Sequence, residues 1–295
     1  MASDTVARLR SFNRTVTERV GALETRYLGR SRPLGESRLL WEIGVDGAAV
    51  RDLRRRLGLD SGYVSRLLRS LEQQGLAVVA EDEADARVRV ARLTDRGARE
   101  RAELDRLSDE LARAILEPLD DAQRAKLAAA AETVERLLRA SLVEIAVEDP
   151  RTPDGRWCLQ QYFAELADRF DAGFDPALSI TREDELTPPH GLLLVARLHE
   201  EPVGCGGLSH LRDAAAPEVK RMWVAPSVRG LGLGRRILRE LERHAAAAGA
   251  STIRLETNKA LDEAIQLYRS SGYREVPAFN DEPYAHQWFE KRLGN

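Results

Sequence analysis

The sequence predicts an α+β protein of two domains, a mostly α-helical domain over residues 1–140 followed by an α/β domain over residues 141–295. The chain has 295 residues, about twice the usual length of one domain. In the first half, apolar residues repeat at helical spacing except in one pair of strand-like segments. In the second half, strand-like and helix-like segments alternate. Each half is therefore long enough to bury a core of its own.

Composition indicates an ordinary soluble protein, with 43% hydrophobic and 32% charged residues. No apolar run approaches the roughly 18 residues of a membrane span, and the first residues lack the apolar core of a signal peptide. We therefore expect a cytoplasmic protein without a membrane partner. We also expect Cys158 and Cys205 to be buried and no metal to be bound, because no cysteine or histidine has the spacing of a metal ligand.

Basic residues concentrate in one stretch of the first half. The net charge of the chain is −3, but residues 51–69 contain six arginines against only Asp52 and Asp60. A local cluster of this kind is typical of a surface that meets phosphate groups.

Helices are predicted over residues 4–29, over residues 36–45 and over residues 50–57, the last ending at Gly58. The next helix begins near Asp60 and Ser61, which are both favourable N-caps, and ends at Gly75. Its back is apolar, and its front carries small polar residues beside Arg66 and Arg69. Such a front fits the major groove of DNA, although on its own the pattern is equally typical of a helix in any bundle.

Two β segments follow, around residues 76–80 and 88–93, separated by a charged tip that includes Glu81, Asp82 and Glu83. Acidic residues at the tip oppose contact with phosphate groups, so the sequence favours DNA contacts by the preceding helix over contacts by this hairpin. A long helix is then expected from residue 94 to about residue 117. Pro118 interrupts it, and another helix is expected over residues 121–140.

This order of elements resembles the MarR family of bacterial regulators. In that family the hairpin, or wing, carries an Asp-x-Arg element followed by Leu-Thr-x-x-Gly, which Asp85, Arg87, Leu93, Thr94 and Gly97 match. The resemblance implies a winged helix-turn-helix domain that binds a palindromic operator in double-stranded DNA as a homodimer formed by its first and last helices. Two recognition helices would then lie about 34 Å apart. Asp85 would orient the wing, and the implied DNA-contacting residues are Ser61, Tyr63, Ser65, Arg66, Arg69 and Arg87.

In the second half, strands are expected over residues 142–147, 191–198, 203–211 and 218–224, and an aromatic-rich helix over residues 157–170. The sequence RGLGLG at residues 229–234 then joins a strand to a helix. Glycines at such a junction let the backbone approach a ligand and leave the first helical N–H groups free to hold a pyrophosphate. The segment lacks the Gly-Lys-Ser/Thr of a P-loop and the G-x-G-x-x-G of dinucleotide-binding folds.

The pattern Arg-x-x-Gly-x-Gly, preceded by Val-x-Pro, resembles the GCN5-related N-acetyltransferase (GNAT) superfamily. A strand at 252–257, Asn258, a helix containing Tyr268, and Gly272-Tyr273 resemble its second motif. The resemblance covers residues 141–295 and implies a mixed, splayed central sheet that binds acetyl-CoA. The residues it assigns to the cofactor are Met222, Val224, Arg229, Gly230, Leu231, Gly232, Gly234, Arg235 and Asn258.

The same resemblance implies a catalytic pair. Glu218 occupies a position where many members keep a general base, and Tyr268 matches the tyrosine that protonates the departing sulfur. Two simpler interpretations stay open: Glu218 as a solvated carboxylate at a strand end, and Tyr268 as core packing. The candidates for binding the acceptor amine, several of which are equally typical of core aromatics, are Tyr162, Arg169, Phe170, Asn280, Tyr284 and His286.

These observations predict a bifunctional protein, a DNA-binding regulator and an acetyl-CoA-dependent N-acetyltransferase that acts on a small amine or a protein amino group. One alternative is a regulator whose second domain senses acyl-CoA or another effector with negligible turnover. Another is an enzyme whose helical half only dimerises. The presence of both Glu218 and Tyr268 favours turnover, and the arginines around the 60–75 helix favour DNA binding.

Overall fold

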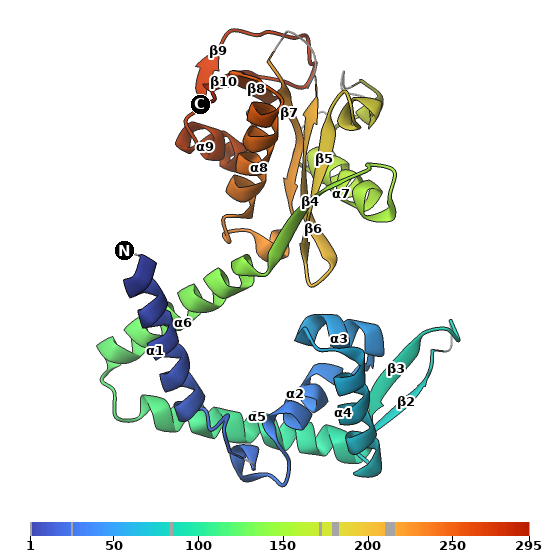
Figure 1. The fold of residues 1–295 in the computed structure, drawn as a ribbon, viewed down its shortest axis with the longest axis vertical. Helices are drawn as coiled ribbons and strands as arrows, with labels where there is room; N and C mark the ends of the chain where they lie inside the picture. Colours follow the sequence, from blue (N-terminus) through green and yellow to red (C-terminus); the bar gives the residue numbers. More distant parts are fainter. Residues whose placement is uncertain are drawn as a thin grey trace. The chain divides into compact units, whose positions relative to one another are not determined.

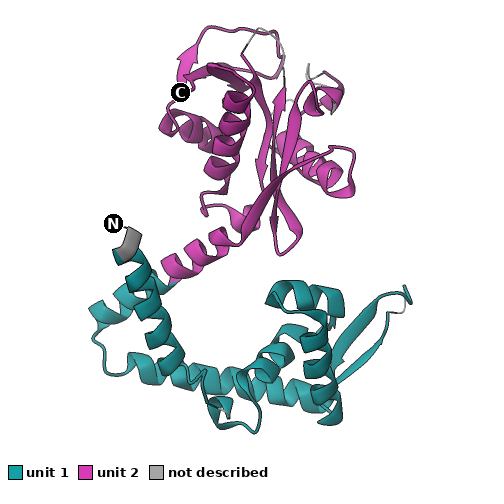
Figure 2. Cartoon of the chain, in the orientation of Figure 1, with its two compact units in different colours: residues 1–131 teal, residues 132–295 magenta. Residues whose placement is uncertain are grey.

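The computed structural model describes residues 2–24, 26–82, 85–170, 173–178, 183–209 and 216–294 (Figure 1). The chain divides into two compact units, residues 1–131 and residues 132–295 (Figure 2). Glu83 of the predicted charged tip lies outside the described residues, as do the last two residues of the strand predicted over 203–211. No helix in the described ranges has both the length and the apolar character needed to cross a membrane.

Helices form most of the first unit, as the apolar spacing predicts. The first of them is shorter than predicted over residues 4–29, because it stops at Arg19. Gly21 has a φ of +66°, and a positive φ takes the chain out of a right-handed helix. The helices are α1 Ala2–Arg19, α2 Leu34–Ile43, α3 Val50–Leu57, α4 Ser61–Gln73, α5 Asp95–Leu116 and α6 Asp121–Ser141, with a short 3₁₀ helix over Tyr27–Gly29. The boundary between the two units falls within α6.

A small antiparallel sheet in the order β1–β3–β2 completes this unit. The two predicted β segments are confirmed as β2 Ala77–Glu81 and β3 Arg89–Leu93, which pair with Val79 opposite Ala91. Strand β1 Ala48–Ala49 was not predicted, because two residues are too few to show alternation. The hairpin β2–β3 is the predicted wing.

Helix α4 is held by its apolar back, and this orients its front. The Asp60 carboxylate caps the helix by accepting a hydrogen bond from the Tyr63 N–H at 2.9 Å. Its buried side chains belong to one core cluster with Leu39 and Leu40 of α2 and with Leu53 of α3; they are Val64, Leu67, Leu68 and Leu71. The opposite side of α4, with Arg66 and Arg69, is exposed to solvent.

The Leu-Thr-x-x-Gly element joins the wing to α5. The Thr94 hydroxyl accepts a hydrogen bond from the Gly97 N–H at 3.0 Å and donates one to the Gly75 carbonyl at 2.7 Å. Gly97 lies so close to the residue before β2 that a Cβ at this position would be 1.8 Å from the Leu76 carbonyl oxygen. The glycine of the motif is therefore required by close packing of α5 against the chain that enters β2.

We expect Gly97→Ala to destabilise the first unit by about 1–3 kcal/mol, because the added methyl group must push α5 away from Leu76. Helix propensity alone predicts the opposite sign, a gain of about 1 kcal/mol. Hydrogen exchange of the α5 amides in the full-length protein measures the change. The exposed neighbour Arg99, changed to Ala, is the control. Unchanged or slower exchange in Gly97→Ala would contradict the packing argument.

The second unit is built on one sheet with the strand order β4–β5–β6–β7–β8–β10–β9. Neighbouring strands are antiparallel except β7 and β8, which are parallel. The strands are β4 Val143–Glu148, β5 Leu192–Leu198, β6 Glu201–Ser209, β7 Glu218–Val224, β8 Thr252–Thr257, β9 Arg274–Val276 and β10 Gln287–Arg292. The strands predicted in this half are confirmed over their described residues.

Helices α7 Pro153–Arg169 and α8 Leu233–Ala247 cover opposite faces of this sheet (Figure 1). Helix α8 buries Ile237, Leu238 and Leu241 in the core cluster that contains the sheet residues. Helix α9 Asp262–Ser270 follows β8 and packs Tyr268 against Phe289 of β10. Short 3₁₀ helices lie at Pro176–Leu178, Glu183–Leu186 and Pro226–Val228.

Candidate functional site

Strands β7 and β8 are joined at one end only. In the described chain they share a single parallel register pair, Glu218 with Arg254, and the Arg254 N–H donates to the Pro217 carbonyl at 2.9 Å. Farther along β7, Met222 and Val224 line a cavity of about 630 Å³, which we call the loop cavity. A strand edge without a partner strand offers its N–H and C=O groups to a ligand. The predicted mixed, splayed sheet is confirmed.

The glycine-rich segment forms another wall of the loop cavity. Gly230 and Gly232 have φ values of +77° and +75°, a conformation that favours glycine. Gly232 is the N-cap of α8 and makes no side-chain cap, so the first N–H groups of this 15-residue helix face the loop. The positive end of a helix dipole and free N–H groups together make a site for an anion.

The two predicted pyrophosphate arginines line the same cavity but bind protein acceptors. The Arg229 guanidinium forms an ion pair with Glu165 of α7 and donates to the Val224 carbonyl at 3.0 Å. The Arg235 guanidinium donates to the Ser270 hydroxyl at 2.8 Å. Arg229 is exposed and Arg235 is half-buried, and these contacts hold both side chains beside the cavity.

Glu165 is a residue of this site that the sequence did not reveal. Besides pairing with Arg229, its carboxylate accepts a hydrogen bond from Trp223 Nε1 at 3.0 Å and one from Arg169 at 3.4 Å. The available signal was the i, i+4 spacing of Glu165 and Arg169 on a helix, which is common on solvated surfaces.

Two other predicted cofactor residues have structural contacts. Leu231 is partly buried against the core of the unit and does not line the loop cavity. Asn258 uses both ends of its amide, donating to the Tyr284 carbonyl at 2.8 Å and accepting from the Ala260 N–H at 2.9 Å. It therefore fixes the C-terminal segment beside the end of β8.

A second, smaller cavity of about 80 Å³ adjoins the first; we call it the aromatic cavity. Tyr268 lines both cavities, as do Tyr162 and Met222. Burial raises the pKa of Tyr268 above its ordinary value, so its hydroxyl keeps its proton at neutral pH. A proton donor therefore lies where the two cavities meet.

Glu218 lies at the joined end of β7 and β8 and lines neither cavity. Its carboxylate is 2.7 Å from Lys220 Nζ, and Lys220 is in turn 2.5 Å from Glu256 of β8. Burial opposes the charge of Lys220, but the two carboxylates outweigh it and raise the pKa of this ammonium. Lys220 and Glu256, which no sequence motif marked, both line the aromatic cavity.

The predicted acceptor-side residues are divided by the structure. Tyr162, Phe170 and Tyr284 line the aromatic cavity. Arg169 lines the loop cavity instead, paired with Glu263 at 2.8 Å. The remaining two, Asn280 and His286, line neither cavity.

Asn280 contacts Glu256, a residue that lines the aromatic cavity. Its amide nitrogen is 3.4 Å from a carboxylate oxygen of both Glu218 and Glu256, and its oxygen accepts from Trp288 Nε1 at 2.8 Å. His286 is exposed, and its backbone N–H bonds to the Thr257 carbonyl.

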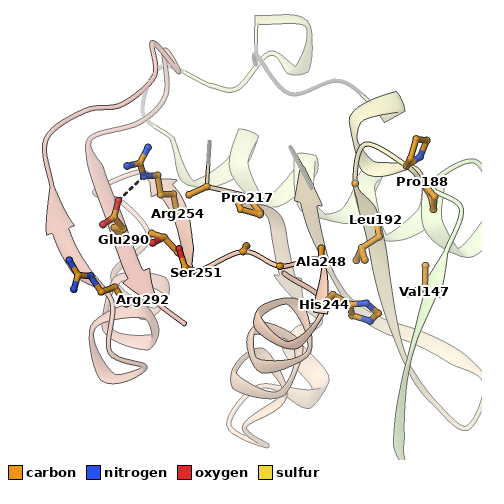
Figure 3. Close-up of a pocket in the computed structure, with 16 residues that line it drawn as sticks. Val147, Pro188, Leu192, Pro217, His244, Ala248, Ser251, Arg254, Glu290 and Arg292 are labelled. Carbon is orange, nitrogen blue, oxygen red and sulfur yellow. Dashed lines mark hydrogen bonds and ion pairs between the residues drawn. The ribbon is translucent and has the colours of Figure 1, made fainter. Parts of the chain in front are cut away.

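A third cavity, of about 1200 Å³, lies at the end of the sheet where β7 and β8 begin (Figure 3). Arg254 forms an ion pair with Glu290 there, and His244 reaches it from the C-terminal part of α8. None of the predicted catalytic or cofactor residues lines it, whereas most of them line the loop cavity or the aromatic cavity. Across the described ranges, no group of three or more His, Cys, Asp or Glu is arranged to hold a metal.

The front of α4 carries the predicted DNA-contacting residues. Ser61, Arg66 and Arg69 are exposed, whereas Tyr63 and Ser65 are half-buried. The Arg66 guanidinium lies 5.4 Å from the centre of the Tyr63 ring, so the tyrosine face supports this arginine. The side chains of Arg66 and Arg69 are therefore available to contact phosphates and base edges.

Arg87 is presented at the wing, where its side chain is 91% exposed. Its Nε lies 3.0 Å from the Asp85 carboxylate, and its own N–H donates to that carboxylate at 3.1 Å. These hydrogen bonds lower the pKa of Asp85. The Asp-x-Arg element thus orients the arginine through a local turn.

Comparisons with known proteins match this division of the chain. Residues 159–273 match the model of the acetyltransferase (GNAT) family, and residues 28–88 match that of the MarR family. An IAA acetyltransferase of Azospirillum brasilense is 34% identical over 142 residues, which are 48% of this chain and 90% of that protein. The chain belongs to the GNAT acetyltransferase family and carries a MarR-family domain in its N-terminal half.

Two solved structures each match about half of this chain. A GNAT family acetyltransferase from Elizabethkingia anophelis with acetyl-CoA bound is 18% identical, with a TM-score of 0.38, and the likeness covers 52% of this chain and 99% of that one. Streptococcus pneumoniae FabT in complex with DNA is 20% identical, with a TM-score of 0.38, over 47% of this chain and 97% of that one.

Gly232 and Gly249 provide a matched test of the loop in the acetyltransferase domain. A Cβ at either position would meet no protein atom within 4 Å. Both glycines have a positive φ, however, so each change to Ala costs about 1–2 kcal/mol of stability through backbone strain. We expect only Gly232→Ala to raise the Kd of acetyl-CoA, by about tenfold, because only its Cβ obstructs the anion site. Calorimetric titration measures both. Equal affinities in the two variants would contradict the assignment of the loop.

Proposed function

We propose that the acetyltransferase domain transfers the acetyl group of acetyl-CoA to an amine, and that the MarR domain binds operator DNA as a homodimer. The observation that carries the enzymatic half is the splay of β7 from β8 beside the loop at residues 229–235. Its geometry suits acetyl-CoA: free N–H groups at the start of α8 face a pyrophosphate, and the open edge of β7 faces the amide-bearing arm. Acetyl-CoA would supply the activated acetyl group.

In this proposal the loop cavity holds acetyl-CoA and the aromatic cavity receives the amine. The acceptor enters as an ammonium and first gives one proton to a carboxylate. The free amine nitrogen then forms a bond to the acetyl carbon as the carbon–sulfur bond breaks. Tyr268 gives its proton to the sulfur and regains one from the acetylated nitrogen, so that free coenzyme A and an N-acetyl product leave.

The carboxylate that receives the proton belongs to the cluster around Lys220. Glu218 was the predicted base, but Glu256 is the member of this cluster that lines the aromatic cavity. We therefore propose Glu256 as the carboxylate nearest the amine. Glu218, which also contacts Lys220, adds a second negative charge to the cluster.

Tyr268→Phe should lower kcat by about 10²–10⁴-fold, because the departing sulfur loses its proton donor. The Kd of acetyl-CoA should stay the same. Coenzyme A release with a panel of amines, together with calorimetry, measures the two quantities. Tyr273→Phe removes a buried hydroxyl outside both cavities and should keep full turnover.

Two results would count against this assignment. Full activity in Tyr268→Phe removes the tyrosine from the chemistry. Tight acetyl-CoA binding with no turnover on any amine, combined with a change in DNA affinity, supports a sensor in place of an enzyme.

For the MarR domain, the proposal is supported by the exposed arginines of α4 and by Arg87 on the wing. Dimerisation is supported by apolar side chains left exposed on helix α1, which are Val6, Leu9, Phe12 and Val16. Helix α6 leaves Leu127, Leu137 and Leu138 exposed as well. A contiguous apolar helix face on a soluble protein is typical of an interface.

Arg66→Ala should weaken binding to a duplex from the protein's own promoter by about 1–3 kcal/mol and relax its sequence preference. Arg87→Ala should weaken binding through the loss of a wing contact. Fluorescence anisotropy at several salt concentrations measures both, and wild-type binding should fall with a log–log slope of about −0.9 per neutralised phosphate. The control is Arg239→Ala, an exposed arginine of α8. Wild-type affinity in both variants would exclude the proposed surface.

A further inference from the structure

The aromatic cavity has one wall of rings that contact one another at tilted and edge-on angles. Phe170, which follows the last residue of α7, Phe174 and Tyr284 approach one another with ring centroids 4.6–6.0 Å apart. Tyr162 of α7 lines the same space and is buried enough that its pKa is raised to about 12. Such a wall excludes water and favours an apolar or aromatic group on whatever molecule enters.

Opposite charges line the remainder of this cavity in equal number. Apart from tyrosines, its ionisable side chains are two cations, Lys220 and Arg221, and two carboxylates, Glu256 and Glu282. Lys220 is held by the carboxylates of Glu256 and Glu218. A binding site with both signs of charge beside an apolar wall is complementary to a zwitterion with an apolar side chain.

Arg221 is placed in this cavity by an irregular backbone. The pairing of β6 with β7 shifts register between Cys205 and Gly207, which leaves a β-bulge on β7. Arg221 has a φ of +55° there, rare for a residue with a Cβ. Its guanidinium lies 4.8 Å from the centre of the Phe163 ring and 5.7 Å from that of Tyr162. Strain of this kind is common where a side chain must be aimed at a ligand.

The size of the cavity limits the part of the acceptor that enters it. A volume of about 80 Å³ corresponds to roughly six water-sized positions, since one needs about 10–15 Å³. Such a space suits the amine-bearing end of a small molecule better than a bulky group.

We propose that the acceptor is a free α-amino acid with an apolar or aromatic side chain. The planar guanidinium of Arg221 binds its carboxylate, Glu256 faces its ammonium group, and the ring wall holds its side chain. This inference rests on the proposed function and names its substrate class. The group transfer is the one already given, with the α-amino nitrogen as the nucleophile.

Pairs of acceptors that differ only in the carboxylate test the proposal in the wild-type protein. They are L-phenylalanine with phenethylamine and L-leucine with isoamylamine. The kcat/KM for coenzyme A release should be about 10- to 100-fold higher for each amino acid than for its amine, the usual range for a hydrogen bond to a charged group. Equal values, or a preference for the amine, a polyamine or a peptide, would overturn the assignment.

Variants of Arg221 locate the effect. Arg221→Gln should lower the ratio of kcat/KM for L-phenylalanine to that for phenethylamine to about one, while Arg221→Lys should restore part of the preference. Arg274→Gln, an exposed arginine on β9, is the control and should behave as wild type. If Arg221→Gln misfolds and loses acetyl-CoA binding, the proposal is tested by the carboxylate preference of the Arg221→Lys variant and of the wild-type protein.

Different results would exclude the amino-acid acceptor and the acetyltransferase activity. Turnover of amines without any carboxylate preference removes the amino-acid acceptor and leaves the acetyltransferase standing. A wild-type protein that binds no acetyl-CoA and releases no coenzyme A with any acceptor overturns both.

Discussion

The candidate active site depends on how β7 and β8 are supported separately. β7 takes its ladder from β6 on one side, and β8 pairs with β10 over six residues on the other. The two strands share a single register pair. Each strand is therefore ordered without its parallel neighbour, and the sheet can stay open where they separate. An ordinary sheet would close this gap with hydrogen bonds; here the backbone groups face a cavity.

The joined end carries the charge cluster that links the strands. Lys220 of β7 and Glu256 of β8 form a buried ion pair, and Glu218 contacts the same ammonium. Removing one partner of a buried pair typically costs about 3–5 kcal/mol, because the other charge is left in a poorly solvated place. The cluster thus has two consequences: it couples the strands at one point, and it brings a carboxylate to the aromatic cavity.

Features encoded by neighbouring residues were predictable from the sequence. The N-cap Asp60, the Asp85–Arg87 turn, the Thr94–Gly97 junction and the glycine loop before α8 each depend on a few consecutive residues, and each lies where it was expected. The overlong first helix was wrong because apolar spacing continued past Gly21, whose positive φ ends the helical path.

Contacts between distant residues were not predictable. Glu165 and Arg229 are 64 residues apart, and Lys220 and Glu256 are 36 apart. Only the order of the strands and the position of α7 bring them together, and no local pattern records that. The same limit applies to the carboxylates around Lys220. The contact of Glu218 with Lys220 is local, because the two residues are neighbours on one face of β7, but the fact that Glu256 and not Glu218 lines the aromatic cavity depends on how β7 and β8 lie together.

The central claim is that the open edge of β7 and the loop at residues 229–235 together bind acetyl-CoA. Hydrogen–deuterium exchange of the full-length protein, with and without acetyl-CoA, tests it most directly. The account predicts slower exchange on binding in peptides that cover residues 222–236, with little change in β10. Protection confined to other segments, or none at saturating acetyl-CoA, would contradict it.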